Sequence, residues 1–230
     1  MPKNRTLVPV LTSFYSQTMT FFGELVQSIL PARCPLCMKP SDCGEGMGLC
    51  GVCAPQLNSR LRMTMTPPSM VRCWTIGAYD GPHGVLVRRV KYGRSIRVAD
   101  HLGRRLGEAL SEVASVMDID AIVHVPVPTY RKIRRGFDQS LQLAHGVAGV
   151  LDVPLFNALV RLDGREQAGR SGPERRRLRM DAFGLCAISL PKRVLVVDDV
   201  LTTGATLHSV ARVLKKGGTE RVFGAVVASS

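Results

Sequence analysis

Aromatic residues are scarce in this chain of 230 residues, at 5% of the sequence with a single tryptophan. Stacking on aromatic rings is therefore a minor means of contact with any nucleic acid, and backbone contact with little sequence preference is favoured instead. Glycine is plentiful, with 22 residues, and 45% of the chain is apolar. This balance favours an α/β domain with glycine-bearing turns over a β-sandwich.

Long apolar runs are also missing. No stretch approaches the roughly 20 apolar residues that a membrane-spanning helix needs. The first thirty residues lack a basic start followed by a compact apolar run and a small-residue cleavage site, which a secretory signal would have. We therefore expect a cytoplasmic protein with no transmembrane segment.

Acidic residues are outnumbered, since 18 Asp and Glu face 31 Lys and Arg, for a net charge of +13. Residues 1–58 carry four basic and three acidic residues, so +12 of the charge lies in residues 59–230. A phosphorylated or nucleic-acid partner suits such a region. A solvated basic surface is the equally simple alternative.

Four of the seven cysteines form two Cys-x-x-Cys pairs. The pairs are Cys34 with Cys37 and Cys50 with Cys53. Two thiols two residues apart can hold one ion, and four thiolates predict a structural zinc in a reducing compartment. Cys43 lies between the pairs and is an alternative ligand, and two redox pairs are the alternative chemistry. We expect Cys73 and Cys186 to be small core residues.

The pattern divides the chain into a small and a large part. The predicted segments are an N-terminal amphipathic helix within 1–33, a zinc knuckle over 34–58, a linker over 59–71 and a main domain over 72–230. The helix covers 13–30 and stops at Pro31, and the linker contains Pro67 and Pro68.

Strands and helices alternate along the predicted main domain. Strands are expected over 73–79, 121–125, 194–197 and 222–227, and helices over 84–92, 98–116, 139–150 and 205–216. Residues 161–181 break this periodicity, and their seven arginines predict a long basic loop. The alternation predicts an α/β fold, with a mainly parallel sheet flanked by helices.

The most informative stretch is 194–206, VLVVDDVLTTGAT. It predicts an apolar strand, two carboxylates, a hydroxyl-rich turn and a helix start. Free N–H groups and the helix dipole suit a phosphate there, and adjacent carboxylates suit ribose hydroxyls. The candidate ligands are Asp198, Asp199, Thr202, Thr203, Gly204, Ala205 and Thr206. A threonine-capped turn with two solvated acids is the alternative.

This stretch resembles the signature of type I phosphoribosyltransferases. With the cysteine pairs and the segments 90–93 (VKYG), 125–128 (VPVP), 135–140 (RGFDQS) and 167–171 (QAGRS), the chain is identified as a member of the ComF-type competence proteins. Two positions depart from the family pattern. Asp138 stands where Asn is usual, and 175–178 read RRRL where an Asn is expected three residues after an Arg.

The resemblance implies a ligand, cofactors and partners. Asp198 and Asp199 would hold the ribose 2′ and 3′ hydroxyls of phosphoribosyl pyrophosphate, and residues 202–206 would hold its 5-phosphate. Magnesium would bind the pyrophosphate, and reaction would pass through an oxocarbenium-like C1. Candidates on the pyrophosphate side are Lys91, Val127, Pro128 and Arg135. The family also implies a role in DNA uptake during natural transformation, with the uptake machinery as partner.

Two functions stay open on the sequence. One is a magnesium-dependent phosphoribosyltransferase, whose acceptor no motif identifies. The other is a non-catalytic accessory protein that binds single-stranded DNA with the same fold. Its candidate contacts are Arg88, Arg89, Arg131, Lys132, Arg134 and Arg135. Arginines that merely face water are the structural alternative.

Overall fold

The computed structural model describes residues 33–40, 47–93, 95–162 and 182–230. The chain forms two compact units, Met1–Cys53 and Ala54–Ser230. The helix expected over 13–30, the thiol of Cys43 and the part of the expected basic loop from 163 to 181 lie outside the described residues.

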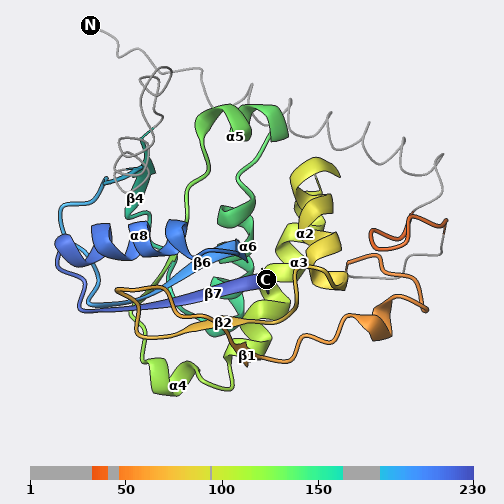
Figure 1. Cartoon of the computed structure of the whole chain (residues 1–230), viewed down its shortest axis with the longest axis horizontal. Helices are drawn as coiled ribbons and strands as arrows, with labels where there is room; N and C mark the ends of the chain where they lie inside the picture. The colour runs from red at the N-terminus through yellow and green to blue at the C-terminus, as the bar shows by residue number, and fades with distance from the viewer. Residues whose placement is uncertain (1–32, 41–46, 94, 163–181) are drawn as a thin grey trace, which may run out of the picture. The chain divides into compact units, whose positions relative to one another are not determined.

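The second unit is built on a five-stranded sheet in the order β1-β2-β7-β6-β3 (Figure 1). The strands are β1 (Arg62–Met63), β2 (Cys73–Thr75), β3 (Ala121–His124), β6 (Arg193–Leu201) and β7 (Arg221–Ser229). Only β1 is antiparallel to its neighbour, and β2, β7, β6 and β3 pair in parallel. Strands β6 and β7 are buried through their middles, as expected of a parallel sheet covered on both faces.

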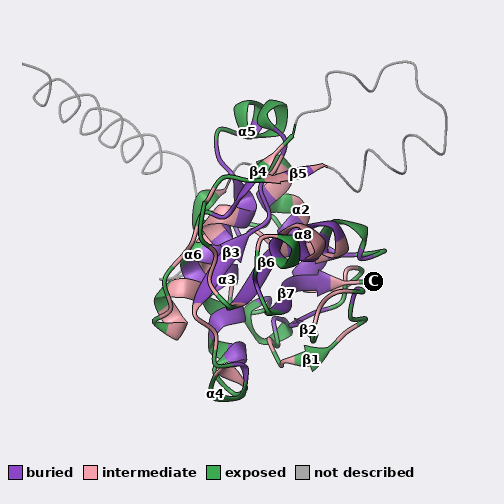
Figure 2. Ribbon diagram, turned by 90° about the vertical axis from the view of Figure 1, so that its left-hand side faces the viewer, coloured by how far each residue is buried: buried purple, intermediate pink, exposed green. Residues whose placement is uncertain are grey.

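Helices cover both faces of this sheet. The helices described in this unit are α2 (Pro82–Gly93), α3 (Ile96–Leu110), α4 (Ala114–Met117), α5 (Thr129–Arg135), α6 (Gln139–Leu151) and α8 (Ala205–Lys216), with a short 3-10 turn at Ala54–Gln56. Figure 2 shows α8 on one side of the sheet and α3 and α6 on the other. Because strand side chains alternate, Val194 and Val196 of β6 pack with Leu207 and Leu214 of α8.

Two glycines let α3 and α6 approach closely. A Cβ at Gly103 would lie 2.3 Å from the Leu143 carbonyl oxygen, and one at Gly146 would lie 2.6 Å from the Asp100 carbonyl oxygen. Each glycine therefore meets the backbone of the opposite helix. This contact fixes α6, whose first residues reach the end of β6.

The predicted fold class is confirmed, and the structure adds detail that the pattern did not give. The helix expected over 98–116 is two helices, α3 and α4, separated at Ser111–Val113. Helix α5 and the antiparallel hairpin of β4 (Leu159–Arg161) with β5 (Phe183–Leu185) were not predicted. The expected linker contributes β1. Among the described residues, no helix is long and apolar enough to cross a membrane.

Candidate functional site

The four predicted metal ligands lie together in the first unit. The sulfur atoms of Cys34, Cys37, Cys50 and Cys53 all lie within 4.8 Å of one another. Those of Cys37 and Cys50 are 3.9 Å apart. Around a tetrahedral zinc with Zn–S bonds near 2.3 Å, neighbouring sulfurs are about 3.8 Å apart. The cluster therefore fits a zinc ion.

Backbone turns hold these thiols in place. The Met38 N–H donates to the Cys34 carbonyl at 2.8 Å, and the Cys53 N–H donates to the Cys50 carbonyl at 2.9 Å. Burial raises the pKa of the Cys34 thiol, but backbone N–H groups, led by that of Cys37, outweigh it and lower this pKa to about 6. Burial and the neighbouring sulfurs raise the pKa of Cys53 to about 12. A bound cation would relieve this crowding of thiolates.

In the second unit, Asp199 lies near the end of β6 with both carboxylate oxygens engaged. Its Oδ1 is 2.9 Å from the Lys91 Nζ of α2. Its Oδ2 accepts a hydrogen bond from the Gln139 Nε2 of α6 at 3.2 Å. The Asp199 side chain is 9% exposed and that of Lys91 is 22% exposed. The acid is thus partly buried and compensated by residues from two helices.

Asp198, the preceding residue of β6, also contacts α6. Its Oδ1 accepts hydrogen bonds from the Ser140 hydroxyl at 3.0 Å and from the Asp199 N–H at 2.8 Å. Burial, followed by the charge of Asp199, raises the pKa of Asp198 to about 7. The folded chain therefore holds a proton on Asp198 more tightly than an ordinary carboxyl group would.

The segment 135–140 organises this acid pair. Gly136 ends α5 with a φ of 83°, which favours glycine. Asp138 caps α6 by accepting from the Leu141 N–H at 3.2 Å, and its other oxygen accepts from the Val127 N–H at 3.3 Å. Asp138 thereby ties the loop after β3 to the start of α6. Asparagine has only one oxygen for these two bonds, so the departure from the family pattern has a structural use.

The predicted phosphate loop forms the turn between β6 and α8. Gly204 is the N-cap of α8 with a φ of 74° and has no side chain to cap the helix. The side chains of Thr202, Thr203 and Thr206 are exposed. The first turn of α8 therefore presents N–H groups and hydroxyls, which together suit an anion.

The segment before β2 supports this turn. The Pro68 carbonyl oxygen lies 2.7 Å from the His208 Nδ1 of α8. A Cβ at Gly204 would lie 3.1 Å from the Pro67 Cγ. The prolines of the expected linker thus pack against the start of α8.

The candidates for the pyrophosphate side come from α2 and from the loop and helix after β3. Val127 is partly exposed and Pro128 is buried, where its carbonyl accepts from the Arg131 N–H at 2.9 Å. Arg135 is only 6% exposed. Its Nε and Nη1 have no hydrogen-bond partner within the described residues, and burial lowers its pKa while the Asp199 charge partly restores it. Arg135 is thus a buried donor on which the charge of Asp199 acts.

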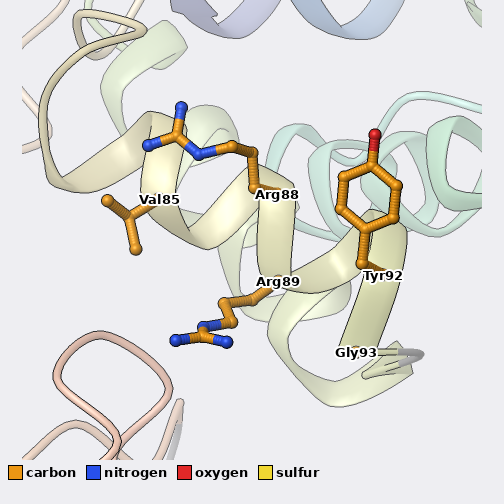
Figure 3. Close-up of a pocket in the computed structure, with 5 residues that line it drawn as sticks. All are labelled: Val85, Arg88, Arg89, Tyr92 and Gly93. Carbon is orange, nitrogen blue, oxygen red and sulfur yellow. The ribbon is translucent and has the colours of Figure 1, made fainter.

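The other basic candidates lie on the surface. Helix α5 exposes Arg131, Lys132 and Arg134 together with Tyr130, which is 61% exposed. In Figures 1 and 2 this helix stands clear of the sheet. On α2, the candidates Arg88 and Arg89 line a surface hollow of about 330 Å³ together with Val85, Tyr92 and Gly93 (Figure 3).

Comparison with known proteins identifies the family. The model of the phosphoribosyl transferase domain matches residues 138–230. Competence protein F of Haemophilus influenzae is 32% identical over 163 residues, which are 67% of this chain and 71% of that protein. The chain belongs to the ComF family. Its larger unit is a type I phosphoribosyltransferase domain.

Further relatives extend the ComF comparison. The DNA utilization protein YhgH of Escherichia coli O157:H7 is 29% identical over 216 residues, which cover 84% of this chain and 95% of that protein. A glutamine phosphoribosylpyrophosphate amidotransferase structure from B. subtilis is 22% identical with a TM-score of 0.42. That likeness covers 57% of this chain and 27% of the amidotransferase, and it is too weak to support an inference.

Two residues of this ComF-family chain contact the acid pair but were not predicted as site residues from the sequence. They are Gln139 and Ser140. They lie 60 and 58 residues from the carboxylates they contact. Their segment, 135–140, runs into the helix expected over 139–150, and this position was the available signal.

One expectation outside the site was wrong, because Cys186 is exposed and not a core residue, whereas Cys73 is fully buried.

Proposed function

We propose that this ComF-family chain binds phosphoribosyl pyrophosphate at the end of β6 and the start of α8. The observation that carries the proposal is the acid pair Asp198 and Asp199, which Gln139 and Ser140 contact, on the strand that leads into the glycine-capped start of α8. Vicinal carboxylates suit ribose hydroxyls, and the open helix start suits the 5-phosphate. Both groups are present on one ribose 5-phosphate.

The pyrophosphate then lies toward Lys91, Arg135 and the loop at Val127 and Pro128. Two buried nitrogens of Arg135 that have no hydrogen-bond partner in the described part of the chain support this assignment. Magnesium, when bound with the pyrophosphate, would supply further neutralisation of its charge. Cations around a departing pyrophosphate favour phosphoribosyl transfer, so the catalytic form of the proposal is a magnesium-dependent transferase.

The setting we propose is DNA uptake or use in the cytoplasm, with the uptake machinery as partner. It rests on relatives whose names refer to competence and DNA utilization. We also propose that the cysteine cluster holds zinc in a structural role, because all four ligands are thiols and no position is left for a reactive water.

Calorimetric titration of the full chain with phosphoribosyl pyrophosphate and magnesium tests the proposal. Asp199→Asn and Thr203→Ala should each weaken binding by about 10-fold or more, because each removes a polar contact to the ligand. Asp100→Asn makes the same chemical change at a surface ion pair on α3 and should bind like wild type. Absence of binding by folded, zinc-loaded wild type would reject the proposed ligand.

A second candidate function is binding of single-stranded DNA as an accessory protein. Helix α5 favours it, because six of its seven residues are exposed and three of these are cationic. The exposed Tyr130 adds a ring on which a base can stack. The sequence had suggested backbone contact alone, and α5 offers both kinds of contact.

Titration of a labelled oligonucleotide at several salt concentrations tests this candidate. Arg131→Ala with Arg134→Ala should weaken binding and make its dependence on salt less steep, since two phosphate contacts are lost. Lys215→Ala with Lys216→Ala removes two exposed cations from α8 and is the matched control. Arg135 is left unchanged because it is buried. Equal losses in both double variants would assign the binding to net charge and not to α5.

A further inference from the structure

The contact between Lys91 and Asp199 occupies an atom that the proposed ligand needs. The Asp199 Oδ1 is taken by Lys91 at 2.9 Å and the Oδ2 by Gln139 at 3.2 Å. A ribose hydroxyl that donates to this carboxylate must therefore compete with one of these two partners. Ligand binding at Asp199 requires an exchange of hydrogen bonds.

Lys91 is the partner that can leave. Gln139 is the first residue of α6, is only 4% exposed, and is fixed by a helix that packs closely on α3. Lys91 lies in the last turn of α2, and four rotatable bonds separate its ammonium group from the backbone. Its side chain is more exposed than that of Asp199. The ammonium can swing aside while the helices stay in place.

Asp199 keeps a counter-charge when Lys91 leaves. The Arg135 guanidinium is buried close enough for the Asp199 charge to act on it, and two of its nitrogens have no hydrogen-bond partner among the described residues. A buried carboxylate without any cation nearby would be costly, and Arg135 avoids that cost. The free energy of ligand binding therefore depends on whether the displaced Lys91 ammonium meets another anion.

The group at C1 of the ribose determines whether such an anion is present. In ribose 5-phosphate the only phosphate lies at the far end of the sugar, which the proposed function places at the loop 202–206. In phosphoribosyl pyrophosphate, C1 carries a pyrophosphate beside the hydroxyls that Asp199 would hold. Only this second ligand offers the displaced ammonium an anion nearby.

We infer that Lys91 is a specificity-determining residue, which competes with the ribose hydroxyls for Asp199 and yields to ligands that carry a pyrophosphate at C1. This inference rests on the proposed function and adds selection between two ligands at the same site. Lys91 makes ribose 5-phosphate a poor ligand because the ion pair must break without replacement. It makes the pyrophosphate-bearing ligand a good one because the ion pair is exchanged for another.

The test compares two ligands on three forms of the full chain. Wild type, Lys91→Met and Lys215→Met are titrated in the calorimeter with ribose 5-phosphate and with phosphoribosyl pyrophosphate plus magnesium. Lys215 is also a lysine in the last turn of a helix, and it is exposed, so Lys215→Met controls for loss of one positive charge. Thermal melting of each variant confirms that it is folded.

Lys91→Met should weaken binding of phosphoribosyl pyrophosphate by about 10- to 100-fold, the usual effect of losing a charge-assisted hydrogen bond. Its binding of ribose 5-phosphate should be tighter, because no ion pair at Asp199 then has to break. Lys91→Arg keeps the charge and should retain most of the preference, and Lys91→Gln should lose it even if Lys91→Met does not fold. Lys215→Met should keep the wild-type ratio of the two affinities.

Different failures have different meanings. Equal weakening of both ligands by Lys91→Met, or unchanged binding of phosphoribosyl pyrophosphate, would overturn the inference and leave the proposed function standing. If the wild type binds neither of the two ligands, the proposed function is overturned, and this inference with it.

Discussion

The two units of the chain differ in how they hold groups that can carry negative charge, four thiols in the first and two carboxyl groups in the second. In the first, four thiols from residues 34–53 surround a space that fits a cation, and the described residues 33–40 and 47–53 offer only Cys34 and Cys53 as buried apolar side chains. In the second, an ion pair with Lys91 and a hydrogen bond from Gln139 hold Asp199, and a hydrogen bond from Ser140 holds Asp198, on a sheet covered by helices. The first arrangement could hold a metal ion, and the second is held by side chains from other elements of the fold.

This difference sets what each unit should depend on. A cluster with little core of its own gains most of its stability from the metal, as small zinc modules do. The acid pair depends on α2 and α6 being held against the sheet, so its geometry should respond to packing far from the carboxylates. Changes that affect one unit and not the other are therefore the sharpest tests of the comparison.

The largest effect is expected at the cysteine cluster. Cys34→Ser removes one of four thiolates, and the zinc content of the purified chain should fall from about one ion to almost none. Cys186→Ser is the matched control, because Cys186 is an exposed cysteine outside the cluster. Metal analysis of both variants measures the effect. Full zinc content in Cys34→Ser would show that this thiol is not a ligand.

A smaller but still large effect is expected where α3 meets α6. Gly103→Ala places a Cβ 2.3 Å from the Leu143 carbonyl oxygen, so the helices must separate, at a cost of about 1–3 kcal/mol in the free energy of unfolding. A Cβ at Gly149, a glycine of α6, would meet nothing within 4 Å, so Gly149→Ala should stabilise this helix by about 0.5–1 kcal/mol. Urea denaturation measures both.

The zinc content of Gly103→Ala sharpens this result. It should stay at the wild-type value, since the ligands and the glycine belong to different compact units. Loss of zinc together with loss of stability would show that the two units depend on each other, and the comparison would fail.

The same contrast explains which features were predictable from the sequence. The cysteine ligands are local, because a spacing of two residues places both thiols on one turn, and the structure brings all four together as predicted. The strand, carboxylates, glycine turn and helix of 194–206 are local as well, and β6 and α8 follow that order. Patterns within about 20 residues were thus sufficient for these elements.

Contacts between distant segments were not predictable in this way. Lys91, Gln139 and Ser140 reach the acid pair from other helices, and only the tertiary fold determines which side chains meet there. Helix α5 was missed because it is exposed almost throughout and has no apolar face to give a periodic signal. The burial of Arg135, at the end of an otherwise exposed basic run, could not be predicted either, because no apolar periodicity marks the buried side of α5.

An effect of similar size, confined to a range of pH, is expected from the protonation of Asp198. Its pKa is raised by burial and by Asp199 to about 7, from an ordinary value of 3.8. A carboxyl group with a higher pKa in the folded state binds its proton more tightly there. Its contribution to stability is therefore complete below about pH 4 and is lost as the pH rises to about 7. Asp198→Asn cannot ionise and should lose this part of the decline, on the order of 1–3 kcal/mol.

Urea midpoints at pH 5 and pH 7.5 measure this decline in wild type, Asp198→Asn and the surface control Asp100→Asn. The control should decline like wild type, because its ion pair with Arg104 is exposed. If Asp198→Asn declines as steeply as wild type, the carboxyl group is already ionised at pH 5 and the fold compensates its charge fully. The second unit would then hold two full negative charges without an ion, and its contrast with the cysteine cluster would be greater still.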